Sequence, residues 1–430
     1  MHIGIVAYDF PPLNSGGSQR PYYLARYLKA QNIKITVFAP NLEHYPSEDL
    51  NYEVDLNFFN ETRIIRTNIK KNRFWDTVSK SYYFNIIDNL GPMWRAELMG
   101  AVTAEHSVYP FDYLLFTCPP FSLADLGVVV SNKVGVPLIL DMRDAWSLWV
   151  TAPFASYFHY QALRKLENKV LKKAKWVMHT SSQHKRDWLR VHPGLDTEKF
   201  IFVPNGFLEF NRSTLTDSSR IRIFYSGGFY YNPESGNQLR KPWYKRKPYR
   251  YFQYVPRVED WKYRSPFFFF SIVQQLLKGH PYLRDSLEIR FAGKKPDWFD
   301  DMVKGFELRS IVVHLGFINK DQVNKEMAEA DYFLLTSAKV NSGRDYSIAG
   351  KTFEYFSYKK PIIGVVCDGE QKDVLERSGM ALILDPDQVE AGSEQLRKFL
   401  LNNKLSPNYE FINQFKVPNN YSELMERINL

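Results

Sequence analysis

The sequence has few of the features that mark secreted, metal-binding or membrane-spanning proteins. It contains two cysteines, Cys118 and Cys367, in 430 residues. Two distant cysteines provide neither a disulfide framework nor a set of metal ligands, which is typical of a reducing cytosol. No stretch reaches the ~18 consecutive apolar residues of a membrane span, and the first residues lack the pattern of a signal peptide. We therefore expect a cytoplasmic protein.

Motifs for metal and dinucleotide binding are also missing. The nine histidines show no H-x-E or H-E-x-x-H spacing, so we predict no metal site and no bound cofactor. The glycines of the first β-loop-α crossover, Gly16 and Gly17, do not form the G-x-G-x-x-G pattern of a dinucleotide-binding fold. They nevertheless lie where open α/β sheets bind ligands.

What the chain does contain is an alternation of short apolar strands and helices, repeated in two blocks. A chain of 430 residues exceeds one typical core, so two domains are expected. The alternation predicts an α/β fold with two Rossmann-like parallel domains facing across a cleft. The predicted ranges are 1–207, 208–408 with an insert at 229–264, and a C-terminal tail helix at 409–430.

The stretch from Gly343 to Gly364 combines a glycine-containing loop, a short helix and a buried strand. A loop that enters a helix N-terminus gathers unpaired N–H groups, which suits a phosphate. Glu354, one turn into the helix, is an acceptor suited to a pair of sugar hydroxyls. The alternative is a solvated glutamate on an ordinary helix.

Polar residues follow the strand at 137–141, at the ligand-facing edge of such a sheet. Asp144 and the adjacent Arg143 are catalytic candidates, with Trp146 nearby, and Asp144 could orient or deprotonate an acceptor hydroxyl. The alternative is that Asp144 caps the next helix and pairs with Arg143.

Seven short motifs follow one another along the chain. They are Phe10-Pro-Pro with Gly16-Gly17, Asp141-Met-Arg-Asp144-x-Trp146, Val203-Pro-Asn205-Gly206, Tyr225-Ser-Gly227, Gly316-Phe-Ile, Ala330-Asp331-Tyr-Phe-Leu-Leu and Lys351-Thr-Phe-Glu354. In this order they resemble the retaining GT-B glycosyltransferases of family 4, in the branch that builds bacterial surface polysaccharides and lipopolysaccharide. The resemblance spans nearly the whole chain except about 43–100 and 229–264.

The resemblance implies an N-terminal domain for the acceptor and a C-terminal domain for a nucleotide sugar, a UDP-sugar in our prediction. Glu354 would accept hydrogen bonds from the ribose, while Phe317 and Ile318 would flank the base. Gly16 and Gly17 would let the backbone approach the diphosphate or the acceptor from across the cleft, and Trp146 would also lie on the acceptor side of the cleft. The remaining donor-site candidates, mainly for the diphosphate, are Gly227, Gly228, Arg264, Arg344, Lys351 and Thr352.

The chain departs from the family pattern at two positions. Members commonly carry a second glutamate eight residues before the ribose ligand, and here that position is Tyr346. Asp345 is the adjacent carboxylate that would substitute for it. The basic residue that usually follows the Tyr-x-Gly strand is Phe229, so a cation for the phosphates has to come from elsewhere, with Arg264 as the candidate.

The insert carries most of the net charge. Residues 239–264 hold nine Lys or Arg against Glu259 and Asp260, a net of +7 of the +9 of the whole chain. Lys, Arg, Trp and Tyr together suit an anionic membrane surface. The alternatives are a lid over an anionic donor or polymer, a solvated loop and a nucleic-acid patch. Of these we favour the nucleic-acid patch least, and we predict no nucleic-acid partner.

These observations predict a hexosyl or N-acetylhexosaminyl transferase that moves a sugar from a nucleotide donor to a glycan or lipid-linked acceptor, in the cytoplasm or at the inner face of the cell membrane. One alternative is a nucleotide-sugar 2-epimerase of the same architecture. Another is a degenerate member that only binds a glycan or a partner, because the first glutamate is missing.

Overall fold

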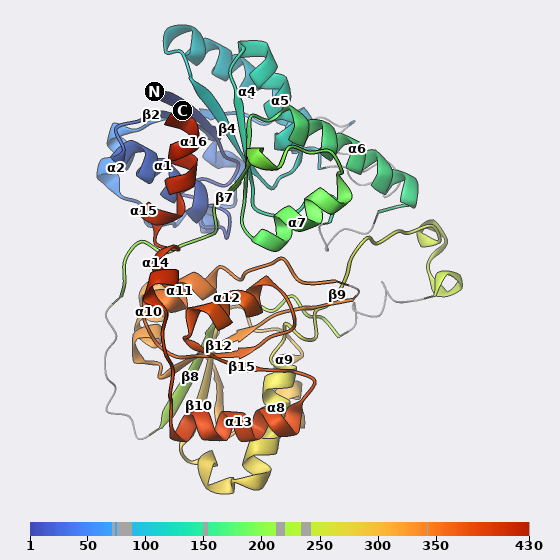
Figure 1. Cartoon of the computed structure of the whole chain (residues 1–430), viewed down its shortest axis with the longest axis vertical. Coiled ribbons are helices and arrows are strands. Elements are labelled where there is room, and N and C mark those ends of the chain that lie inside the picture. Colours follow the sequence, from blue (N-terminus) through green and yellow to red (C-terminus); the bar gives the residue numbers. More distant parts are fainter. Residues whose placement is uncertain are drawn as a thin grey trace. The chain divides into compact units, whose positions relative to one another are not determined.

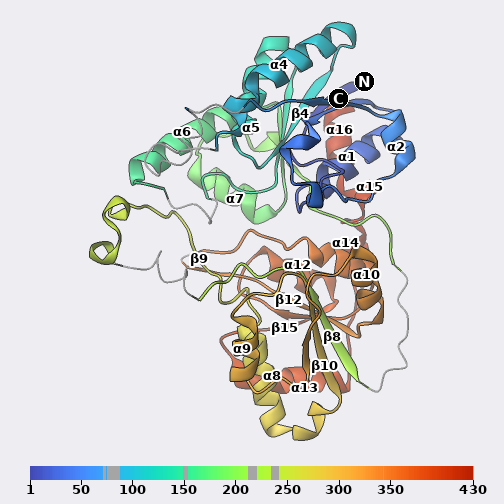
Figure 2. The same cartoon turned by 180° about the vertical axis from the view of Figure 1, so that it is seen from behind.

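The computed structural model describes residues 1–70, 74, 88–148, 154–211, 220–233, 242–341 and 343–429. The chain divides into two compact units, which Figures 1 and 2 show from opposite sides. Unit 1 comprises 1–204, 243–256 and 420–430, and unit 2 comprises 205–242 and 257–419.

Unit 1 is built on a seven-stranded parallel sheet in the order β3-β2-β1-β4-β5-β6-β7. Its central strands are apolar at nearly every position and buried, because helices cover both faces of a parallel sheet. The strands are β1 (His2–Val6), β2 (Lys34–Pro40), β3 (Arg63–Thr67), β4 (Tyr113–Cys118), β5 (Leu138–Met142), β6 (Trp176–His179) and β7 (Phe200–Phe202).

The helices of unit 1 include one from the C-terminus of the chain. In this unit α16 lies beside α1 (Figure 1); Tyr421 stacks on Tyr27 with ring centroids 5.1 Å apart. Glu423 accepts a hydrogen bond from the N–H of Phe202 at 3.2 Å. The helices are α1 (Gln19–Ala30), α2 (Leu56–Glu61), α4 (Leu90–Val108), α5 (Ser122–Val134), α6 (Tyr157–Lys173), α7 (Ser182–Val191) and α16 (Ser422–Asn429).

Unit 2 has a six-stranded parallel sheet in the order β11-β10-β8-β12-β14-β15, and an antiparallel pair, β13-β9. The sheet strands are β8 (Ile221–Ser226), β10 (Leu287–Ala292), β11 (Val312–His314), β12 (Tyr332–Thr336), β14 (Ile362–Val365) and β15 (Ala381–Leu384). The pair consists of β9 (Val258–Asp260) and β13 (Lys339–Asn341). The predicted pair of parallel α/β sheets is confirmed.

Two apolar cores lie on the two faces of this sheet. One packs against α8 (Phe267–Gly279), α9 (Phe299–Gly305) and α13 (Val389–Leu401), and the other against α10 (Lys320–Glu329), α11 (Lys351–Ser357), α12 (Glu370–Ser378) and α14 (Tyr409–Asn413). The short α15 (Val417–Asn420) crosses the boundary between the units.

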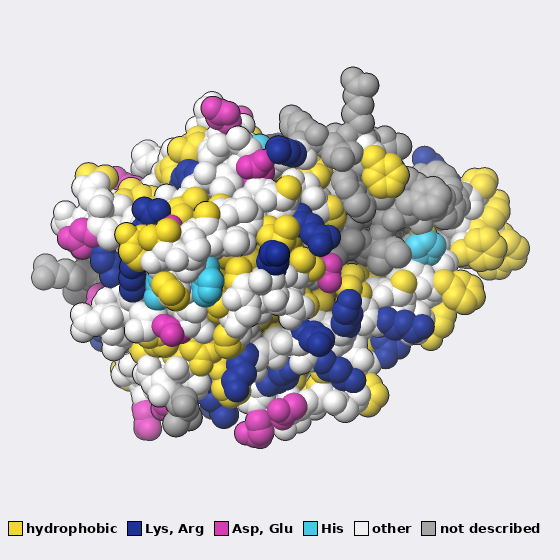
Figure 3. Space-filling view, turned by 90° about the horizontal axis from the view of Figure 1, so that it is seen from above, with side chains coloured by type: hydrophobic (Ala, Val, Ile, Leu, Met, Phe, Trp, Pro, Cys, Tyr) yellow, Lys and Arg dark blue, Asp and Glu magenta, His cyan; other side chains and the backbone are white. Residues whose placement is uncertain are grey.

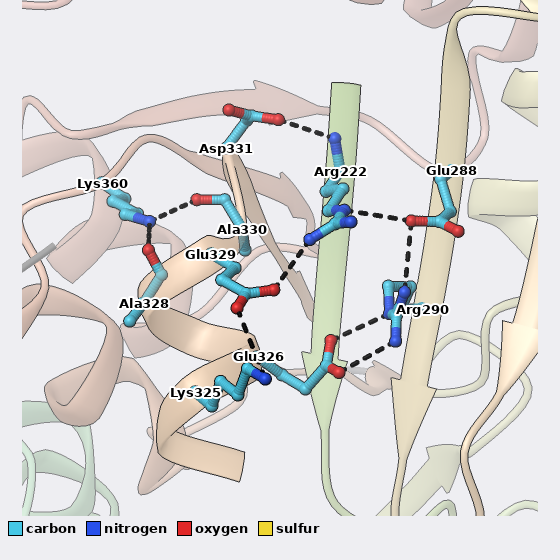
Figure 4. Close-up of polar contacts among 10 residues, drawn as sticks. All are labelled: Arg222, Glu288, Arg290, Lys325, Glu326, Ala328, Glu329, Ala330, Asp331 and Lys360. Atoms are coloured by element: carbon cyan, nitrogen blue, oxygen red, sulfur yellow. Dashed lines mark hydrogen bonds and ion pairs between the residues drawn. The ribbon is translucent and has the colours of Figure 1, made fainter. Parts of the chain in front are cut away.

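A network of charged side chains ties α10 to the neighbouring strands (Figure 4). Arg222 on β8 contacts Glu329 at 2.8 Å and Glu288 at 3.2 Å, and Arg290 on β10 contacts Glu326 at 2.8 Å. All of these groups are partly buried. Burying an unpaired charge is costly, and here each charge has a partner of opposite sign.

The division of the chain differs from the predicted domains at the insert and at the tail. We assigned 229–264 to the C-terminal domain, whereas 243–256 belongs to unit 1 because Tyr254 and Phe154 form a β-bridge there. Of the predicted tail helix 409–430, residues 409–419 belong to unit 2 and 420–430 to unit 1. Residues 234–241 of the insert lie outside the described residues.

Candidate functional site

A pocket of about 280 Å³ lies at the carboxyl end of β8 in unit 2. Parallel sheets bind ligands at this edge. The pocket brings together four of the predicted donor-binding residues: Gly227, Gly228, Arg264 and Lys351. Its other lining residues are Tyr225, Phe229, Tyr230, Leu335, Thr336, Ala349 and Gly350.

Lys351 and Arg264 line this pocket as two cations. The Nζ of Lys351 lies 3.5 Å from the centre of the Tyr225 ring, a favourable contact for an ammonium group. Burial, and then the nearby charge of Arg264, lower the pKa of Lys351 to about 7, while Glu354 acts in the opposite direction. Among the described residues, no carboxylate forms an ion pair with either cation. An anionic ligand in the pocket would pair with Arg264 and favour the charged form of Lys351.

Close backbone contacts around the loop after β8 require glycine at two positions, Gly227 and Gly293. Gly227 has a φ of +117°, a region that residues with a Cβ rarely adopt. A Cβ on Gly293 would come within 2.7 Å of the carbonyl oxygen of Gly227. We predicted that the N–H of Gly227 would bind a phosphate. In the structure this N–H instead donates to the carbonyl of Ala292 at 2.8 Å, so it is not available for that role.

Glu354 lies one turn into α11, three residues after Lys351, and is not among the lining residues of the pocket. Its backbone carbonyl accepts a hydrogen bond from the hydroxyl of Ser357 at 2.5 Å, but within the described part of the chain no group donates to its carboxylate. Burial raises the pKa of this carboxyl, and Lys351 and Lys320 oppose the shift. A half-buried carboxylate with free acceptor oxygens suits the predicted role of holding two hydroxyls.

Thr352 has a different role from the one predicted. Its side chain is fully buried, and its hydroxyl donates to Gln371 at 3.0 Å. Its N–H donates to Ala349 at 2.9 Å. Gln371 also accepts from the N–H of Ala349 at 2.9 Å. Thr352 therefore positions the start of α11 through a glutamine that the sequence did not single out.

The three remaining donor candidates do not line the pocket. Phe317 is 85% exposed in the turn after β11, and Ile318 packs partly against the core. A ring exposed to this degree is available to a flat ligand. Arg344 is held by Asp373 through two contacts of 2.7 Å, so its charge is already compensated.

Asp345 does not offer a free carboxylate in place of the missing glutamate. It is 2% exposed, and Oδ1 accepts hydrogen bonds from Arg257 at 3.1 Å and from the N–H of Ser347 at 2.9 Å. The guanidinium of Arg257 also lies 4.4 Å from the centre of the Tyr346 ring. The end of the insert therefore fixes the loop before α11, and the structure contradicts a catalytic role for Asp345.

In unit 1, Arg143 and Gly17 meet at the carboxyl ends of β1 and β5. The Nη2 of Arg143 donates to Asp9 at 3.3 Å and to the carbonyl of Pro119 at 2.8 Å. A Cβ on Gly17 would lie 1.8 Å from Oδ2 of Asp9, so glycine lets the loop approach this ion pair. Asp9 lies three residues after the end of β1, and its position beyond that strand end is the signal we missed.

Asp144 and Gly16 are accessible in unit 1, whereas Trp146 is not. Asp144 is half-buried and Gly16 is exposed. Trp146 is 4% exposed and stacks on Phe121 with ring planes 7° apart. The burial contradicts the predicted acceptor contact of Trp146 and indicates a packing role.

A buried ion pair that the sequence did not reveal connects α1 to β5 in unit 1. Arg20 on α1 contacts Asp141 on β5 at 2.7 Å, with side chains 5% and 0% exposed. The hydroxyl of Tyr421 donates to the carbonyl of Arg20 at 3.5 Å. This pair fixes α1, which follows the Gly16-Gly17 loop, against the sheet.

A larger pocket in unit 2, of about 500 Å³, lies at the carboxyl ends of β14 and β15. Asp387 at its edge accepts a hydrogen bond from Tyr263 at 2.6 Å and pairs with Lys339. None of the predicted site residues lines this pocket. Its size alone does not make it the stronger candidate, because its two lysines, Lys339 and Lys372, already form ion pairs with Asp387 and Glu376.

Two comparisons bear on this site. Residues 237–412 match the family model of glycosyl transferases group 1. The chain is similar in structure to Anabaena HepE in complex with UDP and glucose, with 12% identity, a TM-score of 0.60 and 99% of each chain covered. The chain has the GT-B fold. This fold and the family match support a GT-B glycosyltransferase.

Two further GT-B structures show how broad this likeness is. The lipopolysaccharide outer core galactosyltransferase WaaB is 12% identical over 100% of this chain and 99% of its own, with a TM-score of 0.57. The UDP-GlcNAc 2-epimerase of Methanocaldococcus jannaschii is 12% identical over 100% and 99%, with a TM-score of 0.52. No curated protein matches the chain in sequence.

None of the described helices has the length and apolar character needed to cross a bilayer. In the same part of the chain, no three His, Cys, Asp or Glu side chains are grouped as metal ligands.

Proposed function

We propose that this protein is a retaining glycosyltransferase of family 4 that transfers a hexosyl or N-acetylhexosaminyl group from a UDP-sugar to a glycan or lipid-linked acceptor. The observation that carries the proposal is the pair of cations, Lys351 and Arg264, without a carboxylate partner among the described residues that line the unit 2 pocket. A nucleotide diphosphate supplies the anion that these cations lack. Surface polysaccharide assembly, in the cytoplasm or at the inner face of the cell membrane, is the pathway we propose.

The chemistry requires stabilisation of the leaving diphosphate. As the glycosidic bond breaks, negative charge develops on the phosphate oxygen. Lys351 and Arg264 would offset this charge without a metal ion, and Glu354 would hold the ribose by accepting its two hydroxyls. The proton of the acceptor hydroxyl would then be accepted either by Asp144 or by the leaving phosphate oxygen itself.

Replacing Asp144 by Asn separates these two routes. A rate below about a hundredth of wild type supports a catalytic base. A rate close to wild type supports proton uptake by the phosphate, in a front-face mechanism with retention.

The second candidate function is a nucleotide-sugar 2-epimerase, which the likeness to the epimerase structure favours. Incubation with a UDP-sugar in the absence of acceptor distinguishes the two, because an epimerase converts the sugar by itself. We expect no conversion without acceptor and, when acceptor is added, a glycoside with the donor's anomeric configuration in its NMR spectrum. Conversion of the UDP-sugar alone would contradict the transferase.

A further inference from the structure

An exposed aromatic surface lies on unit 1, formed by the N-terminal turn of α6 and by residues 243–252 of the insert. We call it the α6–insert surface. Six of the twelve exposed aromatic side chains in the described residues belong to it. Their exposed fractions are 51% for Tyr157, 82% for Phe158, 63% for Trp243, 61% for Tyr244, 39% for Tyr251 and 76% for Phe252.

The insert is fixed to α6 rather than extended into solvent. Phe154 and Tyr254 exchange two backbone hydrogen bonds of 2.9 Å each. The ring of Tyr254 lies 5.1 Å from that of Tyr157 and 4.9 Å from that of Tyr160. These contacts hold the aromatic residues of the two elements on one surface of one unit.

The same segment is strongly basic. Residues 242–256 contain Lys245, Arg246, Lys247 and Arg250 and no acidic residue. Hydrophobic side chains gather at the right of Figure 3, on the side where Figure 1 places α6 and the insert. Water-exposed Trp, Tyr and Phe with four cations and no acid do not resemble an apolar core. The two lysines also distinguish the segment from the core of a protein interface, where aromatic residues and Arg are enriched but Lys is depleted.

We propose that the α6–insert surface docks on an anionic lipid bilayer, with its aromatic rings at the headgroup level and its cations against acidic headgroups. Trp and Tyr favour this interfacial region because one part of the ring is apolar and the other polar. Each Lys or Arg near such a surface strengthens binding by about fivefold at low salt. The inference goes beyond the proposed function, because bilayer binding requires no nucleotide sugar.

Co-sedimentation of the full chain with phospholipid vesicles tests this proposal. Vesicles of phosphatidylcholine with about a third phosphatidylserine bind the protein, and vesicles of phosphatidylcholine alone bind it at least about tenfold less. The variant Lys245→Gln/Lys247→Gln weakens binding by about 25-fold. The matched control Lys278→Gln/Lys304→Gln, with two exposed lysines of unit 2, binds like wild type.

A second pair of variants tests the aromatic contribution. Trp243→Ser/Phe252→Ser reduces binding at high salt, where the charges are screened, whereas Tyr282→Ser/Tyr409→Ser leaves it unchanged. Circular dichroism and the melting temperature verify that each variant is folded.

The proposal is overturned if wild type does not sediment with anionic vesicles, or if the 245/247 variant sediments as wild type does. Binding to a soluble anionic polysaccharide without binding to vesicles also overturns it, in favour of a lid over an acidic polymer. UDP binding is measured in parallel, so that loss of the nucleotide site is distinguished from loss of the bilayer site.

Discussion

The lowered pKa of Lys351 leads to a quantitative prediction for nucleotide binding. With a pKa of about 7, about a tenth of the Lys351 side chains carry a charge at pH 8, and about a hundredth at pH 9. A bound diphosphate favours the charged ammonium, so its pKa rises in the complex. UDP binding therefore takes up about 0.9 proton at pH 8, and UDP affinity falls about tenfold between pH 8 and pH 9.

Isothermal titration calorimetry in two buffers with different ionisation enthalpies measures this uptake. The phosphates of UDP are already ionised above pH 8, so the lysine is the group that takes up the proton. Lys351→Met binds UDP weakly and without proton uptake. Lys351→Arg retains binding at pH 9 without uptake, because a guanidinium does not titrate in this range.

The matched control is Lys359→Met, which removes an exposed lysine just beyond α11 and leaves both the affinity and the uptake unchanged. An uptake near zero in wild type at pH 8 would refute the reasoning. The same holds if Lys351→Met retains the pH dependence of wild type.

Three further predictions concern single side chains. Glu354→Gln weakens UDP binding by about 10- to 100-fold in calorimetry, because hydrogen bonds to a charged acceptor contribute about 1.5–3 kcal/mol; an unchanged affinity would exclude Glu354 as the ribose ligand. Asp141→Asn lowers the free energy of unfolding by about 3–5 kcal/mol in urea titration, since it leaves Arg20 buried without its counter-ion; a loss below about 1 kcal/mol would contradict the importance of this pair. Arg290→Leu lowers the unfolding free energy by about 1–3 kcal/mol, because Glu326 and Glu288 lose their partly buried donor; a melting temperature equal to that of wild type would show that the network is dispensable.

The sequence was sufficient to predict the two parallel sheets, because the strands are short apolar runs and the apolar residues of the helices between them recur at helical spacing. The strand predicted at 137–141 lies within one residue of β5 at each end. Gly227, Gly228 and Lys351 were proposed from the resemblance to the family, and Arg264 from the absence of a basic residue at Phe229; all four line one pocket.

What the sequence did not reveal are contacts that depend on tertiary pairing. The partner of Asp345 is Arg257, 88 residues away, and no local pattern links an insert to a loop at that distance. The pair formed by Arg20 and Asp141 is separated by 121 residues. Trp146 was misjudged because a residue beyond a strand end can face either the ligand edge or the core, and here its ring stacks on Phe121.

The return of the chain end to unit 1 was likewise not predictable. The helix near 421–428 has an apolar stripe that fits either domain, and only the contacts of Tyr421 and Glu423 with unit 1 decide the assignment. Similarly, the insert was recognised as basic and aromatic, but its attachment to α6 depends on the bridge between Phe154 and Tyr254.

The most direct test of the nucleotide-sugar site is a thermal-shift panel of UDP-, GDP- and ADP-sugars on the full chain. A ligand at 100 times its dissociation constant stabilises the folded state by about 2.7 kcal/mol, which for a domain of about 150–250 residues raises the melting temperature by about 5–11 °C. We predict such a shift for a UDP-sugar, and its loss in Lys351→Met. No shift with any of the nucleotide sugars would contradict the proposed donor site.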